Sequence, residues 1–213
     1  MKTILELRNV SKIYETKAYA LNQVNLKIKK HSLNLVLGHS GSGKSTLINL
    51  ASLLDTPTQG DILINGKNTS QMSESEKTHL RHLQTGIVYQ RDNLFPYLTL
   101  LENVMIPMVP KDANKAAQII RTMEINDISK FPQEISVAQQ QRVALSRALI
   151  NNPSLILGDE PTGELNTEDT KKFLDYMLYA RNKAAVLMVS NNPDISEYFG
   201  HVYALKDGSI KEI

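Results

Sequence analysis

The pattern of apolar and polar positions divides the chain into strands that alternate with helices. Short apolar runs typical of buried or half-buried strands occur at 33–37, 61–64, 86–90, 155–157, 185–189 and 202–205. The chain before residue 33 also alternates in the manner of strands. Apolar spacing compatible with helices occurs at 46–54, 113–124, 137–151 and 167–180, and residues 65–66 and 206–209 have turn composition. This alternation predicts an α/β fold with a mainly parallel sheet.

The middle of the chain has a different character. Prolines at 96, 107, 110 and 132 punctuate helical stretches between residues 91 and 151. We therefore expect a helical subdomain over about 91–151, inserted into a core formed by about 1–90 and 152–213. Because no repeat, low-complexity tract or linker is visible, the prediction is a single domain spanning 1–213.

Composition narrows the possible functions. The 213 residues are 41% hydrophobic and 22% charged, which is typical of a globular protein. The 24 Lys and Arg against 22 Asp and Glu give a net charge of +2, so we expect no nucleic-acid partner. The absence of cysteine excludes disulfides and a cysteine nucleophile. No apolar run approaches the ~18 residues of a membrane helix, so the chain taken alone is expected to be soluble.

Residues 38–45 read Gly-His-Ser-Gly-Ser-Gly-Lys-Ser and match the phosphate-binding pattern G-x-x-x-x-G-K-[ST] between a strand and a helix. Glycines let the backbone wrap around phosphates, and the N–H groups of the following helix attract them. Lys44 is expected to reach the β- and γ-phosphates, and Ser45 to bind Mg²⁺. The alternative is an accidental glycine-rich turn. The predicted nucleotide-binding residues are Gly38, His39, Ser40, Gly41, Ser42, Gly43, Lys44, Ser45 and Thr46.

Two carboxylates, Asp159 and Glu160, follow the apolar run 155–157. Ligand sites of open α/β sheets lie at the carboxyl ends of strands. Asp159 is therefore predicted to hold Mg²⁺ and Glu160 to act as general base toward a water molecule. A solvated loop entrance is the alternative. The guanine-reading tetrapeptide N-K-x-D is missing, because the Asn-Lys pairs at 114–115 and 182–183 are both followed by Ala-Ala, which argues against a GTPase.

With these motifs in this order, the chain resembles the ATP-binding subunit of ABC transporters over essentially its whole length. The resemblance implies a P-loop NTPase fold with a RecA-like, mainly parallel sheet, an N-terminal antiparallel β part and an inserted α-helical subdomain. It also implies that Tyr14 stacks on the adenine of ATP, although a surface or core tyrosine is the alternative. Gln90 would join Mg²⁺ and the attacking water to a transmembrane partner.

The remaining family motifs are present in altered form. Residues 135–142 lie where the signature L-S-G-G-Q-x-Q-R belongs, which implies that Ser136 and Gln139 contact the γ-phosphate bound to a second subunit. Residues 161–166 follow as the D-loop does, and Asn191 takes the catalytic place of the switch histidine. Four residues depart from the family pattern: Val137, Ala138, Asn166 and Asn191.

These departures affect the γ-phosphate contacts and the dimer seam, while the residues for binding nucleotide and metal are kept. A β-branched side chain at 137 adds bulk where glycine allows close approach, and Asn191 is unable to become a cation. We hypothesise that the protein binds Mg-ATP well and hydrolyses it slowly. Neutral drift at tolerant positions is the alternative.

The segments 93–104 and 159–163 resemble one branch of the family, the lipoprotein-releasing and macrolide- or peptide-exporting ATPases with the related cell-division ATPase. This implies a peripheral subunit on the cytoplasmic face of the plasma membrane. Its partners would be a permease on a separate chain and a second ATP-binding subunit, in a homo- or heterodimer. A regulatory ATP switch is the alternative function. The apolar stretch 94–108 is expected to be either subdomain core or a groove for a permease helix.

Overall fold

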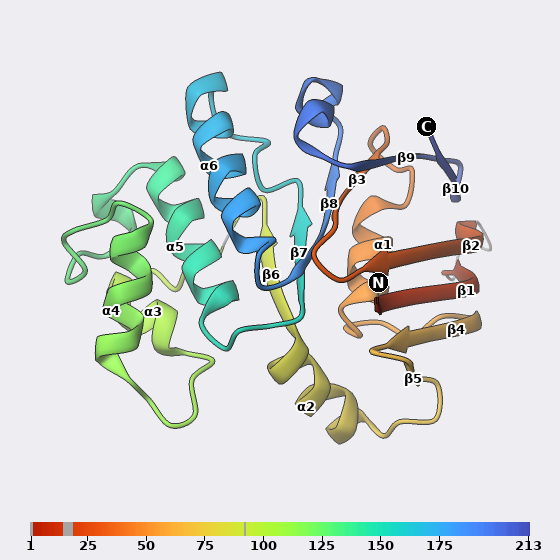
Figure 1. Ribbon diagram of the computed structural model, residues 1–213, viewed down its shortest axis with the longest axis horizontal. Helices are drawn as coiled ribbons and strands as arrows, with labels where there is room; N and C mark the ends of the chain where they lie inside the picture. Colours follow the sequence, from red (N-terminus) through yellow and green to blue (C-terminus); the bar gives the residue numbers. More distant parts are fainter. Residues whose placement is uncertain (1, 15–18, 92) are drawn as a thin grey trace.

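The computed structural model describes residues 2–14, 19–91 and 93–213, which form two sheets and surrounding helices (Figure 1). The larger sheet has the strand order β10-β9-β3-β8-β7-β6, and its strands from β9 to β6 are parallel. These strands are β3 (Leu33–Leu37), β6 (Thr85–Tyr89), β7 (Leu155–Asp159), β8 (Ala185–Ser190), β9 (His201–Lys206) and β10 (Ser209–Glu212). The mainly parallel sheet that the sequence predicts is confirmed.

The smaller sheet is antiparallel and has the order β2-β1-β4-β5. Its strands are β1 (Thr3–Ile13), β2 (Tyr19–Lys29), β4 (Gln59–Ile64) and β5 (Lys67–Asn68). Asn65 and Gly66 both have positive φ, of 52° and 81°, as a tight hairpin turn between β4 and β5 requires. The expected antiparallel N-terminal part is therefore present.

Helices cover both faces of the larger sheet. The helices of the described residues are α1 (Lys44–Ala51), α2 (Glu74–Gln84), α3 (Leu100–Met105), α4 (Ala113–Thr122), α5 (Val137–Leu149) and α6 (Thr167–Ala180), with single 3₁₀ segments at Pro132–Glu134 and Pro193–Tyr198. In β8, Leu187 packs with α1 and the smaller sheet, whereas Met188 packs with α5 and α6. This two-residue alternation is that of a strand buried on both faces. Figure 1 shows α1 between the two sheets and α5 with α6 on the other side.

The helices α3, α4 and α5 share a hydrophobic cluster of their own. Leu100, Val104, Ile120 and Val143 are fully buried in it. The predicted boundaries of a helical subdomain near residues 91 and 151 stay a prediction.

The stretch 94–108 divides between core and surface. Leu100, Val104 and Met108 are buried in the α3–α4–α5 cluster, whereas Tyr97 is 71% exposed and Ile106 is 38% exposed. Subdomain core is therefore the right interpretation for part of the stretch, and the exposed remainder is available to a partner.

One predicted helix has different ends in the structure. The apolar pattern predicts a helix over 46–54, but α1 begins at Lys44 and ends at Ala51. Gly43 has φ of 105° and ends the preceding loop, so the helix begins directly after it. Leu53 has φ of 61°, which takes the chain out of the helix and leaves Leu54 51% exposed. Two further predicted helices also end early, α4 at Thr122 and α5 at Leu149.

A buried asparagine fixes the turn that leads into α3. The Asn103 side chain is fully buried, accepts a hydrogen bond from Phe95 N (2.8 Å) and donates to the carbonyl oxygens of Leu98 and Thr99 (3.0 Å each). These contacts join the turn 95–99 to the first turn of α3.

We predict that Asn103→Ala lowers the free energy of unfolding by about 2 kcal/mol, because it removes a buried amide that forms several hydrogen bonds to the backbone of the preceding turn. Urea denaturation measures this change. The control Asn114→Ala removes an exposed amide from α4 and should change the free energy by no more than about 0.5 kcal/mol. Equal unfolding midpoints for the two variants would contradict the assignment.

Candidate nucleotide site

The predicted motifs meet at one edge of the larger sheet. In the parallel register, Leu37 at the end of β3 lies opposite Ser190 at the end of β8. Asp159 at the end of β7 lies opposite Val189 and Tyr89, the latter ending β6. The residues that follow these strand ends are the loop 38–43, Asn191, Glu160 and Gln90. Their common position is where ligands bind in open α/β sheets.

The loop from Gly38 to Gly43 has the close packing that its glycines permit. A Cβ at Gly43 would lie 2.2 Å from the carbonyl oxygen of Ala20, so the start of β2 supports the loop from behind. Ser42 is buried, and its hydroxyl has no hydrogen-bond partner among the described residues. The first N–H groups of α1 follow immediately and have no partner within the helix. The arrangement fits an anion, and phosphate in particular.

Lys44 connects this loop to the acidic pair. Its side chain is only 5% exposed, and its ammonium group donates to the carbonyl oxygens of Gly38 and His39, at 2.7 Å each. The same group lies 3.2 Å from a carboxylate oxygen of Glu160. A buried ammonium needs such partners to offset the loss of hydration. The sequence assigned both residues to the site, and the structure brings them into contact.

Glu160 adopts a backbone conformation that is unfavourable for this residue type. Its φ is 48°, in the left-handed region, which costs about 1–2 kcal/mol for a non-glycine residue. The conformation is held by its N–H, which donates to Val189 O (3.0 Å), and by its carbonyl, which accepts from Gly163 N (3.0 Å). Strain maintained by surrounding contacts is characteristic of functional positions.

Asp159 lies beside Glu160 and the loop. Burial raises the pKa of the Asp159 carboxyl, and the negative charge of Glu160 acts in the same direction, against a hydrogen bond from Ser45 and the charge of Lys44. The Ser45 hydroxyl and the Asp159 carboxylate therefore lie together, and hydroxyl and carboxylate oxygens are ligands that Mg²⁺ prefers.

Gln90 lies against the loop that follows Glu160. A Cβ at Gly163 would be 2.7 Å from the Gln90 side-chain nitrogen, so the Gln90 amide lies close to the backbone of this loop. The Gln90 carbonyl accepts from the side chain of Gln141 on α5, at 2.7 Å. Gln141 was not among the predicted site residues, although it belongs to the stretch 135–142 that resembles the family signature.

The signature residues have a local role in their own chain. Ser136 Oγ accepts from Gln139 N (3.2 Å) and Gln139 Oε1 accepts from Ser136 N (3.0 Å), which is a capping box at the start of α5. Ala138 is buried, whereas Val137 is 44% exposed. Because α1 and α5 pack on opposite faces of the larger sheet, one chain places this capping box and the phosphate loop on different sides.

Three other candidate residues lie at the margins of the site. Tyr14 follows β1; its hydroxyl donates to Asp55 (2.9 Å), and the Lys12 ammonium lies 5.0 Å from the ring centre. Asn166 is the N-cap of α6 and accepts from Asp169 N (2.9 Å), a role that asparagine and aspartate fill equally well. Asn191 is exposed and lines a hollow of about 360 Å³ against the loop after Glu160.

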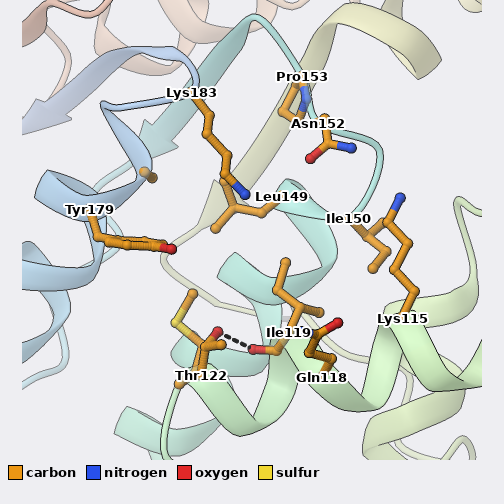
Figure 2. Close-up of a pocket in the computed structure, with 12 residues that line it drawn as sticks. Lys115, Gln118, Ile119, Thr122, Leu149, Ile150, Asn152, Pro153, Tyr179 and Lys183 are labelled. Atoms are coloured by element: carbon orange, nitrogen blue, oxygen red, sulfur yellow. Dashed lines mark hydrogen bonds between the residues drawn. The ribbon is translucent and has the colours of Figure 1, made fainter.

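A separate cavity of about 230 Å³ lies between α4, α5 and α6 (Figure 2). Figure 2 shows Tyr179 and Lys183 on one side of it and Ile119 of α4 facing them. Pro153 and Lys183 line it just before β7 and β8 begin, so it lies at the amino edge of the parallel strands. This cavity is therefore not part of the site at the carboxyl edge.

A phosphate loop leading into a helix, with an acidic pair at the end of a neighbouring parallel strand, defines a P-loop NTPase. The sequence profile described as "ABC transporter" matches residues 21–163. The chain belongs to the ABC transporter family and is an ATP-binding subunit with ATPase activity.

Individual relatives match along nearly the whole chain. The lipoprotein-releasing system ATP-binding protein LolD of Aquifex aeolicus is 36% identical, over 99% of this chain and 97% of LolD. The macrolide export ATP-binding/permease protein MacB of Pasteurella multocida is 34% identical over 97% of this chain and 34% of MacB. A dimeric, post-hydrolysis structure of the ATP-binding cassette MJ0796 bound to ADP and Pi superimposes with a TM-score of 0.88, at 33% identity, and covers 99% and 98% of the two chains.

In the part of the chain that the structure describes, no helix is both long enough and apolar enough to cross a membrane.

We predict that Asp159→Asn stabilises the protein in the absence of nucleotide and abolishes turnover. A raised pKa means that the folded state disfavours the ionised Asp159 carboxyl. The free energy of unfolding therefore decreases as pH rises from the pKa of this carboxyl in the unfolded chain through its higher pKa in the folded chain, and the protein carries this destabilisation at neutral pH. The neutral amide should raise Tm by about 2–4 °C, which is about 1 kcal/mol for a domain of this size.

Turnover of Asp159→Asn should fall by about 10²-fold or more, because the charge that the sequence predicts to hold Mg²⁺ is lost. Calorimetry at pH 7 and a phosphate-release assay measure the two effects. The control Asp175→Asn changes an exposed carboxylate of α6 and should alter neither. A lower Tm for Asp159→Asn would refute the electrostatic argument.

Proposed function

We propose that this subunit binds Mg-ATP, dimerises around it and couples its binding and hydrolysis to the motion of a separate membrane permease. The observation that carries the proposal is the contact of the Lys44 ammonium with both the phosphate loop and Glu160. This contact supports the roles of phosphate-binding cation for Lys44 and general base for Glu160, because both side chains belong to one group of contacts at the carboxyl edge of the sheet.

The donor set fits a magnesium nucleotide. We assign the β- and γ-phosphates to Lys44, and Mg²⁺ to the oxygens of Ser45, Asp159 and Gln90. Magnesium supplies charge neutralisation at the transferred phosphate. Glu160 orients and deprotonates the attacking water, and the Lys44 ammonium at 3.2 Å holds the Glu160 carboxylate in place.

The remaining nucleotide contacts follow from the loop. The backbone N–H groups of residues 38–46, His39, Ser40 and Thr46 among them, surround the phosphates. Tyr14 stacks on the adenine; its ring is 44% exposed while its hydroxyl is held by Asp55. These assignments rest on the family resemblance together with the positions of the side chains.

A second cassette completes the site. Ser136 and Gln139 would contact the γ-phosphate of the partner subunit, since one chain holds α5 and the phosphate loop on opposite sides of the sheet. The dimeric structure of the MJ0796 cassette, which superimposes closely on this chain, supports such an assembly. The partner is a second copy of this chain or a related subunit.

A groove of about 420 Å³ is the proposed contact with the permease. It runs between the core and the inserted helical subdomain, which we place at about 91–151, and Leu54, Ile106 and Arg147 line it. Burial lowers the pKa of the Arg147 guanidinium, so a partly desolvated cation faces this groove. An apolar helix carrying a carboxylate matches that lining.

The likeness to LolD and MacB supports export or extraction of a lipoprotein, peptide or drug-like cargo by a complex on the cytoplasmic face of the plasma membrane. The net charge of +2 gives no reason to expect a nucleic-acid partner.

The alternative is a regulatory ATP switch that controls a membrane partner with little turnover. The observation in its favour is the exposed Val137 side chain at the capping box, where the family has glycine, together with the neutral Asn191 at the switch position. Ala138 is buried in its own chain, and Asn166 performs a helix-capping role that needs no charge. Val137 and Asn191 are therefore the departures most able to slow hydrolysis.

We predict that three site variants raise the ATPase rate by about 10-fold or more: Val137→Gly, Asn191→His, and both combined with Ala138→Gly. Val137→Gly removes bulk where the γ-phosphate is expected, and Asn191→His restores a side chain that can become a cation beside it. The assay uses the purified chain and the complex with its permease. Val109→Gly and Asn182→His make the same changes at exposed positions outside the site and should have no effect. Unchanged turnover in all three site variants would show that the departures do not limit hydrolysis.

We predict that Ile106→Asp reduces the amount of permease that co-purifies with this subunit by at least about 10-fold, because it places a charge in an apolar contact. Pull-down from a detergent extract, followed by quantitative mass spectrometry, measures the loss. Val109→Asp provides the control, since Val109 is 84% exposed in the same segment and does not line the groove. The groove is the wrong surface if both variants retain the permease equally.

A further inference from the structure

The loop that carries Glu160 is ordered mainly by short-range hydrogen bonds. Gly163 N donates to Glu160 O (3.0 Å), and Leu165 N donates to Thr162 O (3.1 Å). At its end, Asn166 caps α6. Glu160 itself is held by the hydrogen bond of its N–H to Val189 O and by its ion pair with Lys44, and the pairing of Tyr89 with Asp159 fixes the start of the loop relative to the strand end at Gln90. The short-range contacts shape residues 161–166 but do not join this later part of the loop to the segment after β6.

The segment after β6 is anchored separately, to α5. The Gln141 side chain donates to the carbonyl oxygens of Tyr89 (3.1 Å) and Gln90 (2.7 Å). Asn93 accepts from Tyr89 N (2.8 Å), and its amide also donates to Gln141 (3.1 Å). Asn93 and Gln141 are both buried, so this anchor is protected from solvent.

An ion pair joins the two segments. The Arg91 guanidinium Nε donates to a carboxylate oxygen of Glu164, and 73 residues separate the two in sequence. Beneath the pair lies a hollow of about 300 Å³, which Gln90, Val137, Gln141 and Glu164 help to line. Packing across the hollow is therefore incomplete. Among the described residues of segment 89–93 and loop 160–166, two side-chain contacts join the segments: the approach of Gln90 to Gly163 and the Arg91–Glu164 ion pair.

We infer that Arg91 and Glu164 are positioning residues for ATP hydrolysis, because their ion pair joins the part of the loop after Glu160 to the segment after Gln90, which is itself anchored to α5. The inference rests on the proposed role of Glu160 as general base. Gln90 and Glu160 must act on one metal and one water, so the loop and the strand end have to keep a constant separation during turnover. A displacement of the loop changes the rate of the chemical step and leaves nucleotide affinity nearly unchanged.

The expected effect is modest. The Arg91 side chain is 73% exposed, and exposed ion pairs contribute little to global stability. The position of a catalytic group is more sensitive than stability, so we expect the loss of the ion pair to lower kcat about 2- to 10-fold with KM for ATP within about 2-fold. Tm should remain within about 1 °C of the original.

The experiment compares Arg91→Gln, Glu164→Gln, the double variant and the charge swap Arg91→Glu with Glu164→Arg. Two readouts are used: steady-state ATPase kinetics, and hydrogen exchange of the Gly163 and Leu165 amides in the nucleotide-free protein. The single variants should lower kcat and accelerate exchange at both amides, the double variant should be no worse than either single variant, and the swap should restore at least half of both losses. Added salt at about 1 M should reduce the difference between the original and the variants.

The matched control is Lys172→Gln, which breaks the exposed ion pair of Lys172 with Glu124 away from this loop. The inference is overturned if the Arg91 and Glu164 variants have the same kcat and the same exchange rates as Lys172→Gln. It is also overturned if these variants exchange faster while kcat is unchanged, or if the charge swap restores neither kcat nor the exchange rates. Glu160→Gln is measured in parallel. If Glu160→Gln hydrolyses ATP at the original rate, the proposed base is wrong, whereas failure of the Arg91 and Glu164 variants alone leaves the base assignment intact.

Discussion

The Lys44 ammonium group is buried, so oxygen atoms of the protein have to take the place of the excluded water around it. The chain supplies two of them from the backbone of its own phosphate loop and a third from Glu160, a residue that is remote in sequence. The loop conformation, the left-handed backbone at Glu160 and the adjacency of β3, β8 and β7 are all needed for this arrangement. Loss of any one would leave the desolvated cation with fewer oxygen partners, which destabilises a protein interior.

The four departures from the family pattern differ in how well the structure of this chain accounts for them. Asn166 begins α6 with a side-chain hydrogen bond, and Ala138 is buried against its own chain, so both substitutions satisfy local structure. Val137 is different, because an exposed β-branched residue at the first position of a helix gains little from the fold around it. The stability of α5 therefore gives no reason for valine at this position.

Elements with a strong period were predictable from the sequence, and features that depend on long-range contacts were not. The runs 33–37 and 167–180 coincide with β3 and α6, because apolar alternation and an N-cap define their ends. The helix predicted over 46–54 begins and ends earlier in the structure, because the positive φ angles of Gly43 and Leu53 set its limits. The spacing of apolar residues does not indicate such backbone angles. The phosphate loop and the acidic pair were recognisable as motifs, but the contact between Lys44 and Glu160 required the strand order. The pairing of Arg91 with Glu164 carried no local signal.

The capping box at the start of α5 has a consequence for which residues position 136 tolerates. The Ser136 oxygen accepts the Gln139 N–H, and this leaves the hydroxyl hydrogen free to point outward. One small group can therefore begin a helix and offer a proton to a neighbouring anion at the same time. Aspartate or asparagine would begin the helix equally well, but the first would repel phosphate and the second would present a differently placed, bulkier amide. If Ser136 contacts the γ-phosphate of a second subunit as proposed, helix capping and ligand binding both depend on its hydroxyl group. Very few side chains satisfy both requirements, so position 136 would tolerate fewer substitutions than either requirement alone would allow.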